Sequence, residues 1–427
     1  MTTDTLPAST DFSVLAERYK TIRRFSEELS APLSAEDCGL QSMPDASPTK
    51  WHLAHTTWFF ETFLLAALPC YRAFDDRFAY LFNSYYNTIG KQFPRPHRGL
   101  ISRPGLAEVH EYRRVVDDQI LDVLESDDSR AAQYAATVEI GLQHEQQHQE
   151  LILTDIKHAL AQNPSQPVYR DGEFAVTSMA IGDGWVMHEE GLYHIGHKGD
   201  DGFAFDNESP RHRVFLEAFE VSDRLVTCGE YLRFIEDGGY QRPELWLSLG
   251  WDTVRREQWS APLYWFEQQG EWWEFTLAGP CQIDPERPVC HISFFEADAF
   301  ARWSGVRLPT EAEWEISAAD TFPTGNFVDD YWESDAAIHP GCLAPSDTSP
   351  SRVLGDVWEW TSSPYIAYPG YAPPSGALGE YNGKFMCNQF VLRGGSCATS
   401  VSHIRPTYRN FFPPEARWQF TGIRLCR

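Results

Sequence analysis

The sequence lacks the features that mark membrane and exported proteins. No apolar run approaches the roughly 20 residues that a membrane-spanning helix requires. The first ten residues are polar and carry neither the basic segment nor the apolar core of a signal peptide. The nine cysteines are scattered and include no Cys-x-x-Cys pair, which indicates reduced thiols rather than a disulfide framework. We therefore expect a cytoplasmic protein that does not associate with a membrane.

Basic residues are also scarce. The chain has 35 lysines and arginines against 61 acidic residues, which gives a formal net charge of −26. A surface of this sign repels phosphate backbones, so nucleic acid is not an expected partner. What the sequence does have is 42% hydrophobic and 14% aromatic residues in a chain of 427, enough for two or three packed domains. The oligomeric state stays open, a homo-oligomer included.

Two regions of different character predict an α+β protein. After a tail at residues 1–11, residues 12–162 show helical periodicity, whereas residues 186–427 are rich in glycine, tryptophan and short β-type runs. Residues 163–185 are the expected linker. Four helices in the first region predict a bundle, a fold in which inward-facing side chains commonly build metal sites. These helices are expected to begin at Phe12 and to cover Trp51–Leu68, Glu108–Leu124 and Ala131–Ala161, and further on only Cys228–Glu236 and Phe294–Trp303 are clearly helical.

A pair of histidines is the most informative motif in the first region. His144 and His148 lie in a predicted helix, and their spacing of four places both imidazoles on one face. Far upstream, the segment Trp51-His52-Leu53-Ala54-His55 offers a third imidazole on another predicted helix. Three neutral imidazoles on one side of a metal leave open positions, which suits a non-heme iron or zinc centre.

Several segments of the second region resemble the sulfatase-modifying-factor family, also called formylglycine-generating-enzyme-like. They are Phe205–Glu208 with Pro210 and His212, Val226–Tyr231, Arg307–Glu315, Gly355–Trp360, Val391–Ser396 and Gly422–Leu425. The resemblance implies a C-type-lectin-like α+β domain in which most of these motifs are scaffold. Family members that form formylglycine bind copper through a cysteine pair after the Arg-Gly-Gly-Ser segment. Here Cys397 follows that segment alone, which argues against copper and predicts a buried structural thiol.

The first region resembles the DinB-like four-helix bundle, and the two regions together resemble the ergothioneine-biosynthesis sulfoxide synthases. That resemblance implies Fe(II) held by His55, His144 and His148, with His52 as a packing residue or a neighbour of the ligands. The implied reaction uses O₂ to join L-cysteine to C2 of the imidazole of hercynine (Nα-trimethylhistidine). The expected product is hercynylcysteine sulfoxide.

The same chemistry needs a proton donor near the metal. In the actinobacterial-type members a tyrosine shortly before the Arg-Gly-Gly-Ser segment fills this role, but the stretch Lys384–Phe390 contains none. The loop between two bundle helices supplies Tyr85 and Tyr86, and we expect one of them to act. The alternative is that both are aromatic packing residues.

Three guanidinium groups, those of Arg95, Arg98 and Arg103, follow in the same loop. Because arginine binds carboxylates through two hydrogen bonds, the cluster predicts a clamp for the carboxylate of the thiol substrate. Salt bridges between domains are the alternative. Together with the missing tyrosine, this loop resembles the subgroup of the family that uses free L-cysteine rather than γ-glutamylcysteine.

Further substrate contacts are expected at Gln147, between the two helix histidines, and at Asn410, Phe411 and Phe412. Aromatic faces attract a trimethylammonium group, so the latter segment is a candidate for holding hercynine. A solvated glutamine and two core phenylalanines are the alternatives. The run Asp206-Asn207-Glu208 fits either a structural Ca²⁺ site or turn chemistry.

Other functions are compatible with the same motifs. One is an ovothiol-type synthase that joins cysteine to C5 of unmethylated histidine, and another is a γ-glutamylcysteine-using enzyme. A zinc-dependent thiol transferase and a non-catalytic metal- or ligand-binding module are the remaining alternatives.

Overall fold

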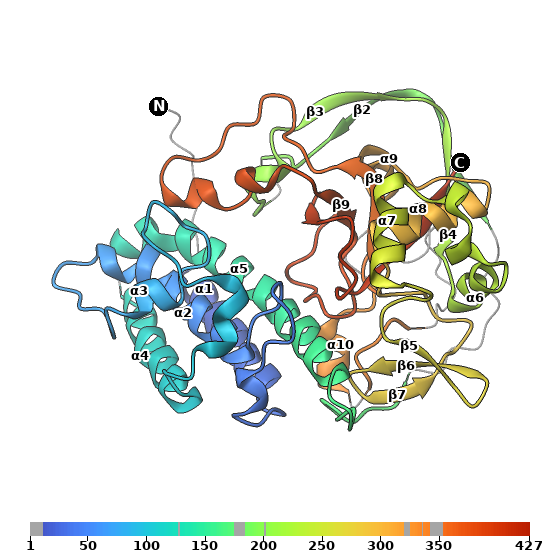
Figure 1. Cartoon of the computed structure of the whole chain (residues 1–427). Coiled ribbons are helices and arrows are strands. Elements are labelled where there is room, and N and C mark those ends of the chain that lie inside the picture. Colours follow the sequence, from blue (N-terminus) through green and yellow to red (C-terminus); the bar gives the residue numbers. More distant parts are fainter. Residues whose placement is uncertain are drawn as a thin grey trace. The chain divides into compact units, whose positions relative to one another are not determined.

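The computed structural model shows two compact units, Met1–Ala159 and Leu160–Arg427 (Figure 1). The predicted tail and part of the predicted linker, residues 175–183, lie outside the described residues. Within the described part of the chain, no helix is long and apolar enough to cross a membrane. The residues that the structure describes are 12–126, 129–174, 184–199, 202–319, 325–334, 336–341 and 353–427.

The first unit is the predicted helical bundle. Its long helices are α1 (Phe12–Ser30), α2 (Thr49–Phe63), α4 (Leu106–Leu124) and α5 (Ser129–Ala161). Helix α2 is buried on nearly all sides, as expected of an apolar helix in the centre of a bundle. Shorter elements connect them, namely η1 (Asp37–Gly39), η2 (Leu65–Ala67), α3 (Phe78–Leu81) and η3 (Arg95–Leu100).

The second unit is built from four small antiparallel or mixed sheets. Their strand orders are β1-β4-β12, β10-β9-β8-β11, β2-β3 and β5-β6-β7. Strand β11 is parallel to β8, whereas the other strand pairs are antiparallel. The strands are β1 (Trp185–His188), β2 (Gly191–Ile195), β3 (His212–Leu216), β4 (Phe219–Leu225), β5 (Trp265–Gln268), β6 (Glu271–Thr276), β7 (Gly279–Gln282), β8 (Trp358–Pro364), β9 (Phe390–Arg393), β10 (Asn410–Phe412), β11 (Thr421–Gly422) and β12 (Arg424–Cys426).

The helices of the second unit are more numerous than the sequence predicts. Helices α6 (Cys228–Glu236) and α8 (Phe294–Trp303) have the predicted bounds. The prediction missed α7 (Ser248–Glu257), α9 (Glu311–Ser317) and α10 (Val328–Glu333). Helix α7 contains residues of low helix propensity, among them Gly250. Gly250 packs closely against α8, since a Cβ atom there would lie 2.9 Å from Cγ of Phe295. Tertiary packing therefore stabilises this helix. The 3₁₀ turns are η4 (Asp206–Glu208), η5 (Gly239–Gln241), η6 (Pro243–Leu245), η7 (Ala377–Glu380) and η8 (Gly383–Phe385).

Buried ion pairs join the family motifs of this unit, as their expected scaffold role requires. Glu359 on β8 accepts hydrogen bonds from the Arg424 guanidinium at 2.9 Å and from the Trp314 indole at 2.6 Å. Glu311 likewise binds Arg393 at 2.8 Å and Arg409 at 3.0 Å, all in the interior. The buried carboxylates of Glu359 and Glu311 therefore hold separate loops of this unit together.

The segment Asp206–Glu208 follows the turn interpretation. Asp206 accepts hydrogen bonds from Tyr371 at 2.7 Å and Asn382 at 2.6 Å, and Glu208 accepts from Arg405 at 2.9 Å. These carboxylates already have protein donors, so the structure gives no support to a Ca²⁺ site at this turn.

Cys397 is fully buried, as predicted for a structural thiol. None of the eight cysteines within the described ranges forms a disulfide.

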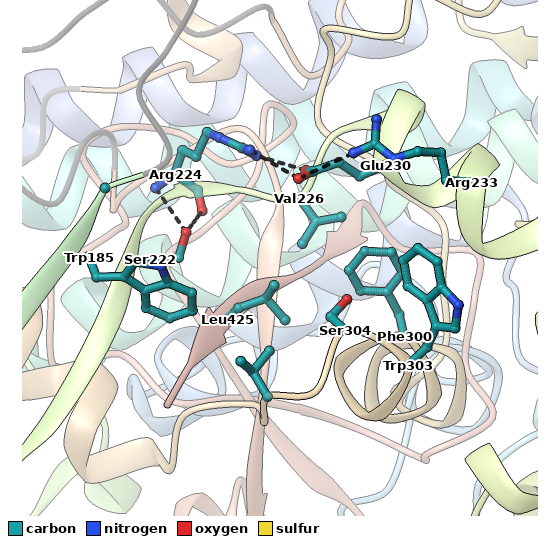
Figure 2. Close-up of a pocket in the computed structure, with 12 residues that line it drawn as sticks. Trp185, Ser222, Arg224, Val226, Glu230, Arg233, Phe300, Trp303, Ser304 and Leu425 are labelled. Atoms are coloured by element: carbon teal, nitrogen blue, oxygen red, sulfur yellow. Dashed lines mark hydrogen bonds and ion pairs between the residues drawn. The ribbon is translucent and has the colours of Figure 1, made fainter.

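The second unit contains a cavity of about 360 Å³ beside β4 and α8 (Figure 2). Trp185, Phe300 and Trp303 form apolar parts of its lining. Glu230 in its lining forms ion pairs with Arg224 at 2.7 Å and with Arg233 at 3.9 Å.

Candidate metal centre

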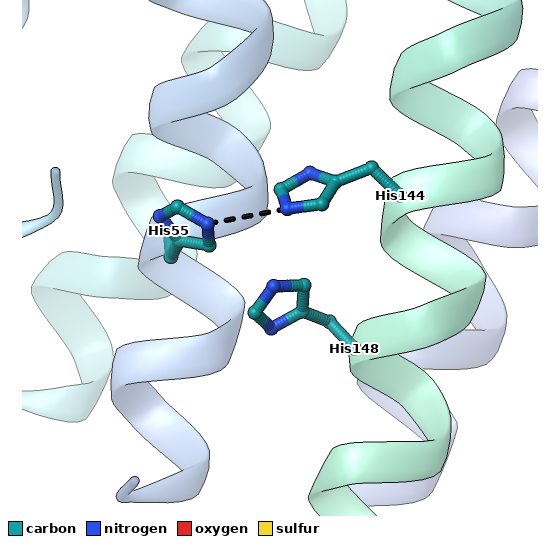
Figure 3. A group of neighbouring side chains, drawn as sticks. All are labelled: His55, His144 and His148. Atoms are coloured by element: carbon teal, nitrogen blue, oxygen red, sulfur yellow. Dashed lines mark hydrogen bonds between the residues drawn. The ribbon is translucent and has the colours of Figure 1, made fainter. Parts of the chain in front are cut away.

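Three buried histidines converge inside the first unit (Figure 3). His55 lies on α2, and His144 and His148 lie one turn apart on α5, so that all three rings meet between the two helices. One ring nitrogen from each lies within 4.8 Å of the others. The Nε2 atoms of His55 and His144 are 3.2 Å apart. No other group of three potential metal ligands is found at this spacing among the described residues.

The hydrogen bond of His55 decides which of its nitrogens can bind a metal. Its Nδ1 atom lies 2.6 Å from the carbonyl oxygen of Phe82, which can only accept a hydrogen bond. The hydrogen of the neutral ring therefore sits on Nδ1, and the Nε2 lone pair faces His144. This donor set fits a metal ion, because imidazole nitrogens are good ligands for iron and zinc.

All three imidazoles are held in the neutral form that binds metals. Burial lowers the pKa of His144 to about 3. Burial, and then His144, lowers the pKa of His55 and of His148 well below its ordinary value. Because protons and metal ions compete for the same lone pairs, these pKa values favour metal binding at neutral pH.

Aromatic rings of α2 surround the histidines and fix their orientation. Trp51 stacks on His55 with ring centroids 4.6 Å apart, and Trp58 stacks on the same ring at 5.5 Å. Phe59 contacts His144 at 4.7 Å. The rings leave the imidazoles little rotational freedom, as a pre-organised metal site requires.

A buried ion network holds the two histidine-bearing helices in place. Glu145, next to His144, is fully buried and binds Arg23 of α1 at 2.6 Å and Arg113 of α4 at 3.0 Å. Burial alone would raise the pKa of Glu145, but the two arginines lower it, so the carboxylate stays charged. The same Arg23 guanidinium donates to Thr57 of α2 at 2.9 Å. Glu145 therefore lies in the interior and fixes α5 against α1 and α4.

Only one of the three loop arginines points into the bundle. Arg98 is 3% exposed, donates to Ser47 at 2.9 Å and lies 3.4 Å from the centre of the Trp51 ring. Arg95 and Arg103 are exposed, and they donate to backbone carbonyls of Asp45 and Ser102. Arg98 also donates to Ser84 at 3.2 Å. Burial, and then Arg95, lowers the pKa of Arg98, whereas the charge of Asp155 raises it. Arg98 is a buried cation that can receive an anion.

The two loop tyrosines differ in burial. Tyr86 is fully buried and packs against Phe63 at 5.1 Å and Trp58 at 5.7 Å. Tyr85 is half-buried and lies on Tyr86, with ring centroids 4.7 Å apart. Both therefore belong to the aromatic cluster that continues to the His55 ring through Trp58.

The remaining predicted contacts are half-buried. Gln147 lies on α5 between the two ligand positions. Asn410, Phe411 and Phe412 form β10 of the second unit, where Phe411 stacks on Tyr365 at 4.0 Å. The stacking is compatible with the packing alternative, and their role toward a substrate stays a prediction.

Sequence reasoning missed the part played by Asp155. It lies on α5 seven residues after His148 and therefore near the same helix face. His52 stands between them, with contacts to both His148 and Asp155. The seven-residue spacing of an acidic residue from a histidine on a buried helix was the available signal.

Comparisons with known proteins cover both units. Residues 18–152 match the DinB superfamily, and residues 174–427 match the sulfatase-modifying factor enzyme 1-like domain. The chain is 31% identical to the hercynine oxygenase of Mycolicibacterium thermoresistibile over 90% of this chain and 88% of that protein. It is 30% identical to the hercynine oxygenase of Mycolicibacterium smegmatis over 75% of this chain and 78% of that protein.

The chain belongs to the hercynine oxygenase family. The family assignment confirms the resemblance that the two regions and the histidine motif carry. A formylglycine-generating enzyme from Thermomonospora curvata is more distant, at 26% identity over 53% of this chain and 92% of that protein.

The buried histidines predict a steep acid sensitivity of the metal-free protein. The folded chain keeps four imidazoles neutral, those of His52, His55, His144 and His148, because burial lowers the pKa of each. The unfolded chain takes up protons on these groups below about pH 6.5, so the free energy of unfolding must fall as the pH drops through that value. Each group contributes up to about 1.4 kcal/mol per pH unit.

Urea unfolding followed by circular dichroism of the helices, between pH 7.5 and 5, measures this slope. Replacing the exposed His97 with glutamine is the control and should leave the slope unchanged. A free energy of unfolding that stays constant between pH 7 and 5 contradicts the prediction.

Proposed function

We propose that this member of the family is an Fe(II)- and O₂-dependent sulfoxide synthase that joins L-cysteine to C2 of hercynine. The C2–H and S–H bonds break, a C–S bond forms, one oxygen atom is added to sulfur and the other leaves as water. Hercynine and cysteine together lose four electrons to O₂. The product is hercynylcysteine sulfoxide.

The observation that carries this proposal is the buried three-histidine group in a chain of the hercynine oxygenase family. His55, His144 and His148 converge within 4.8 Å and supply three neutral nitrogens. Three protein ligands leave positions on the metal for substrates, whereas a structural site is closed by four. Iron, when bound here, would supply the redox chemistry with O₂ that cysteine and hercynine cannot undergo alone.

In the proposed reaction Arg98 binds the carboxylate of the thiol substrate. It is buried beside Trp51, and Trp51 stacks on His55, so the guanidinium lies one ring away from a proposed ligand. Among the described residues Arg98 donates to the hydroxyl groups of Ser47 and Ser84, and Asp155 raises its pKa. A substrate carboxylate would add a direct ion pair. Arg95 and Arg103 are exposed and contribute charge at longer range.

Tyr85 or Tyr86 provides the proton in this proposal. Tyr86 packs on Trp58, which stacks on His55, and Tyr85 packs on Tyr86. A phenol remains protonated at neutral pH and can give a proton to an oxygen that gains charge. Gln147 remains a predicted hydrogen-bond partner for substrate, and Asn410, Phe411 and Phe412 remain predicted contacts of hercynine.

Reconstitution tests the proposed reaction and identifies the thiol. The metal-free protein is loaded with Fe(II) under anaerobic conditions and then exposed to air with hercynine and either L-cysteine or γ-glutamylcysteine. Mass spectrometry should show the cysteine–hercynine sulfoxide, with a lower yield from the other thiol. A Zn(II)-loaded sample should give none, because zinc has no redox chemistry.

No adduct from either thiol, with iron bound, would contradict the synthase proposal. A preference for γ-glutamylcysteine would reject only the choice of thiol. Activity with unmethylated histidine at C5 would favour the ovothiol-type reaction instead.

Replacing Arg98 with glutamine should weaken binding of the thiol substrate selectively. The change removes charge-assisted hydrogen bonds worth about 1.5–3 kcal/mol, so KM for the thiol should rise about 10- to 150-fold. KM for hercynine should change little. Steady-state kinetics with each substrate varied in turn separates the two effects.

Arg103→Gln is the matched control, because Arg103 lies in the same loop and is exposed. An equal rise in both KM values for Arg98→Gln, or the same thiol effect for Arg103→Gln, contradicts the assigned role.

Removing the acting tyrosine hydroxyl should change the product rather than abolish oxygen use. Without the proton donor, Tyr85→Phe or Tyr86→Phe should lose sulfoxide synthesis by about 10²- to 10⁴-fold and divert O₂ into cysteine sulfinic acid. Both products are quantified by mass spectrometry. Tyr80→Phe, at a 44% exposed position, is the control. Unchanged product ratios in both loop variants rule out this pair as the proton donor.

A further inference from the structure

A buried chain of hydrogen bonds runs from Asp155 through His52 to His148. Nε2 of His52 lies 3.1 Å from Oδ2 of Asp155, and Nδ1 of His52 lies 2.8 Å from Nδ1 of His148. The backbone N–H of Ser47 also donates to Oδ2 of Asp155 at 2.7 Å and anchors the carboxylate. Asp155 and His52 are only 5% and 2% exposed, so water does not compete for these bonds.

The chain has one consistent arrangement of hydrogens. As a carboxylate, Asp155 can only accept, so His52 donates from Nε2 and, in the neutral ring, has its lone pair on Nδ1. His148 must then donate from Nδ1 to His52. The lone pair of His148 is thereby placed on Nε2, the nitrogen that remains to face His55 and His144.

We propose that Asp155 and His52 are positioning residues that fix the tautomer and ring orientation of His148 for metal binding. For His55, the backbone carbonyl of Phe82 does the same directly. For His148, the imidazole of His52 on α2 links it to the carboxylate of Asp155, which lies on α5 as His148 does. This inference rests on the three-histidine metal site of the proposed function.

The helix geometry explains why these residues can meet. His52 precedes His55 by three positions on α2, and Asp155 follows His148 by two turns on α5. The pairs His55–His144 and His52–His148 therefore form two successive layers between the same helices. A hydrogen-bond partner behind a metal-binding histidine raises its basicity, and its loss typically costs 10- to 100-fold in metal affinity.

Co(II) titration of the metal-free full-length protein, followed by visible absorption, tests the proposal. His52→Leu removes the acceptor and should raise the Kd for Co(II) about 10- to 100-fold. His52→Asn can place its Oδ1 atom near the position of Nδ1 and should recover most of the affinity. His158→Gln is the control, since His158 lies on α5, as His148 does, and its imidazole binds Ser42 instead.

A double-mutant cycle tests whether the two residues act as one chain. Asp155→Ala should weaken Co(II) binding in the otherwise unchanged protein and should have little further effect in His52→Leu. If the two substitutions lower the affinity for Co(II) by fully additive amounts, the proposed hydrogen-bond chain from Asp155 to His148 is wrong. Asp155→Ala also keeps the proposal testable if His52→Leu does not fold.

Two further measurements distinguish a positioning role of His52 from a purely structural one. In the Co(II) protein, the exchange-protected, hyperfine-shifted N–H proton of His148 should be present in the wild type and absent in His52→Leu. If His52→Leu lowers only the melting temperature of the metal-free protein, with Kd and spectrum unchanged, the positioning role is overturned.

Co(II) binding by two variants distinguishes an error in the positioning role of His52 from an error in the metal site itself. If the wild type and His144→Ala bind Co(II) equally, the three-histidine site is wrong, and the proposed function fails with it. If His144→Ala loses Co(II) and His52→Leu binds as tightly as the wild type, only the positioning chain is wrong.

Discussion

The burial of one carboxylate, that of Glu145, constrains the whole first unit. A charge removed from water must be matched by opposite charge and hydrogen bonds, and breaking such a pair costs about 3–5 kcal/mol. Glu145 is matched by Arg23, Arg113 and Ser26, which lie on two other helices. These contacts allow α5 only one rotation about its axis. In that rotation His144, the preceding residue, turns toward α2.

The neighbouring turn of α5 repeats the arrangement. The Gln149 amide donates to the backbone carbonyl of Ile22 on α1 at 2.8 Å, while His148 faces His52 on α2. Two adjacent faces of α5 therefore have different tasks: one anchors the helix through charges and amides, and the other presents imidazoles. The second unit also uses buried ion pairs of this kind, since Glu359 and Glu311 fix its loops through Arg424, Arg393 and Arg409.

The sequence predicts what depends on local spacing. The faces of α5, the bounds of α6 and α8, and the scaffold role of the motifs all follow from periodicity or from resemblance. What depends on distant partners does not follow. Glu145 could not be assigned to the interior, because its partner Arg23 lies 122 positions away. The loop arginines lie close together in sequence, but a 3₁₀ turn over Arg95–Leu100 directs only Arg98 inward.

The charge of the proposed centre follows from its ligands. Three neutral imidazoles cancel none of the charge of a divalent ion, and Arg98 adds another buried cation close by. Uncompensated charge in a region of low dielectric is costly, so the loaded site favours anionic ligands. A cysteine-type substrate offers two such groups, the thiolate and the carboxylate. A carboxylate in the protein ligand set would cancel part of that charge and weaken this preference. The all-histidine set and the buried arginine therefore support the same class of substrate by the same electrostatic argument.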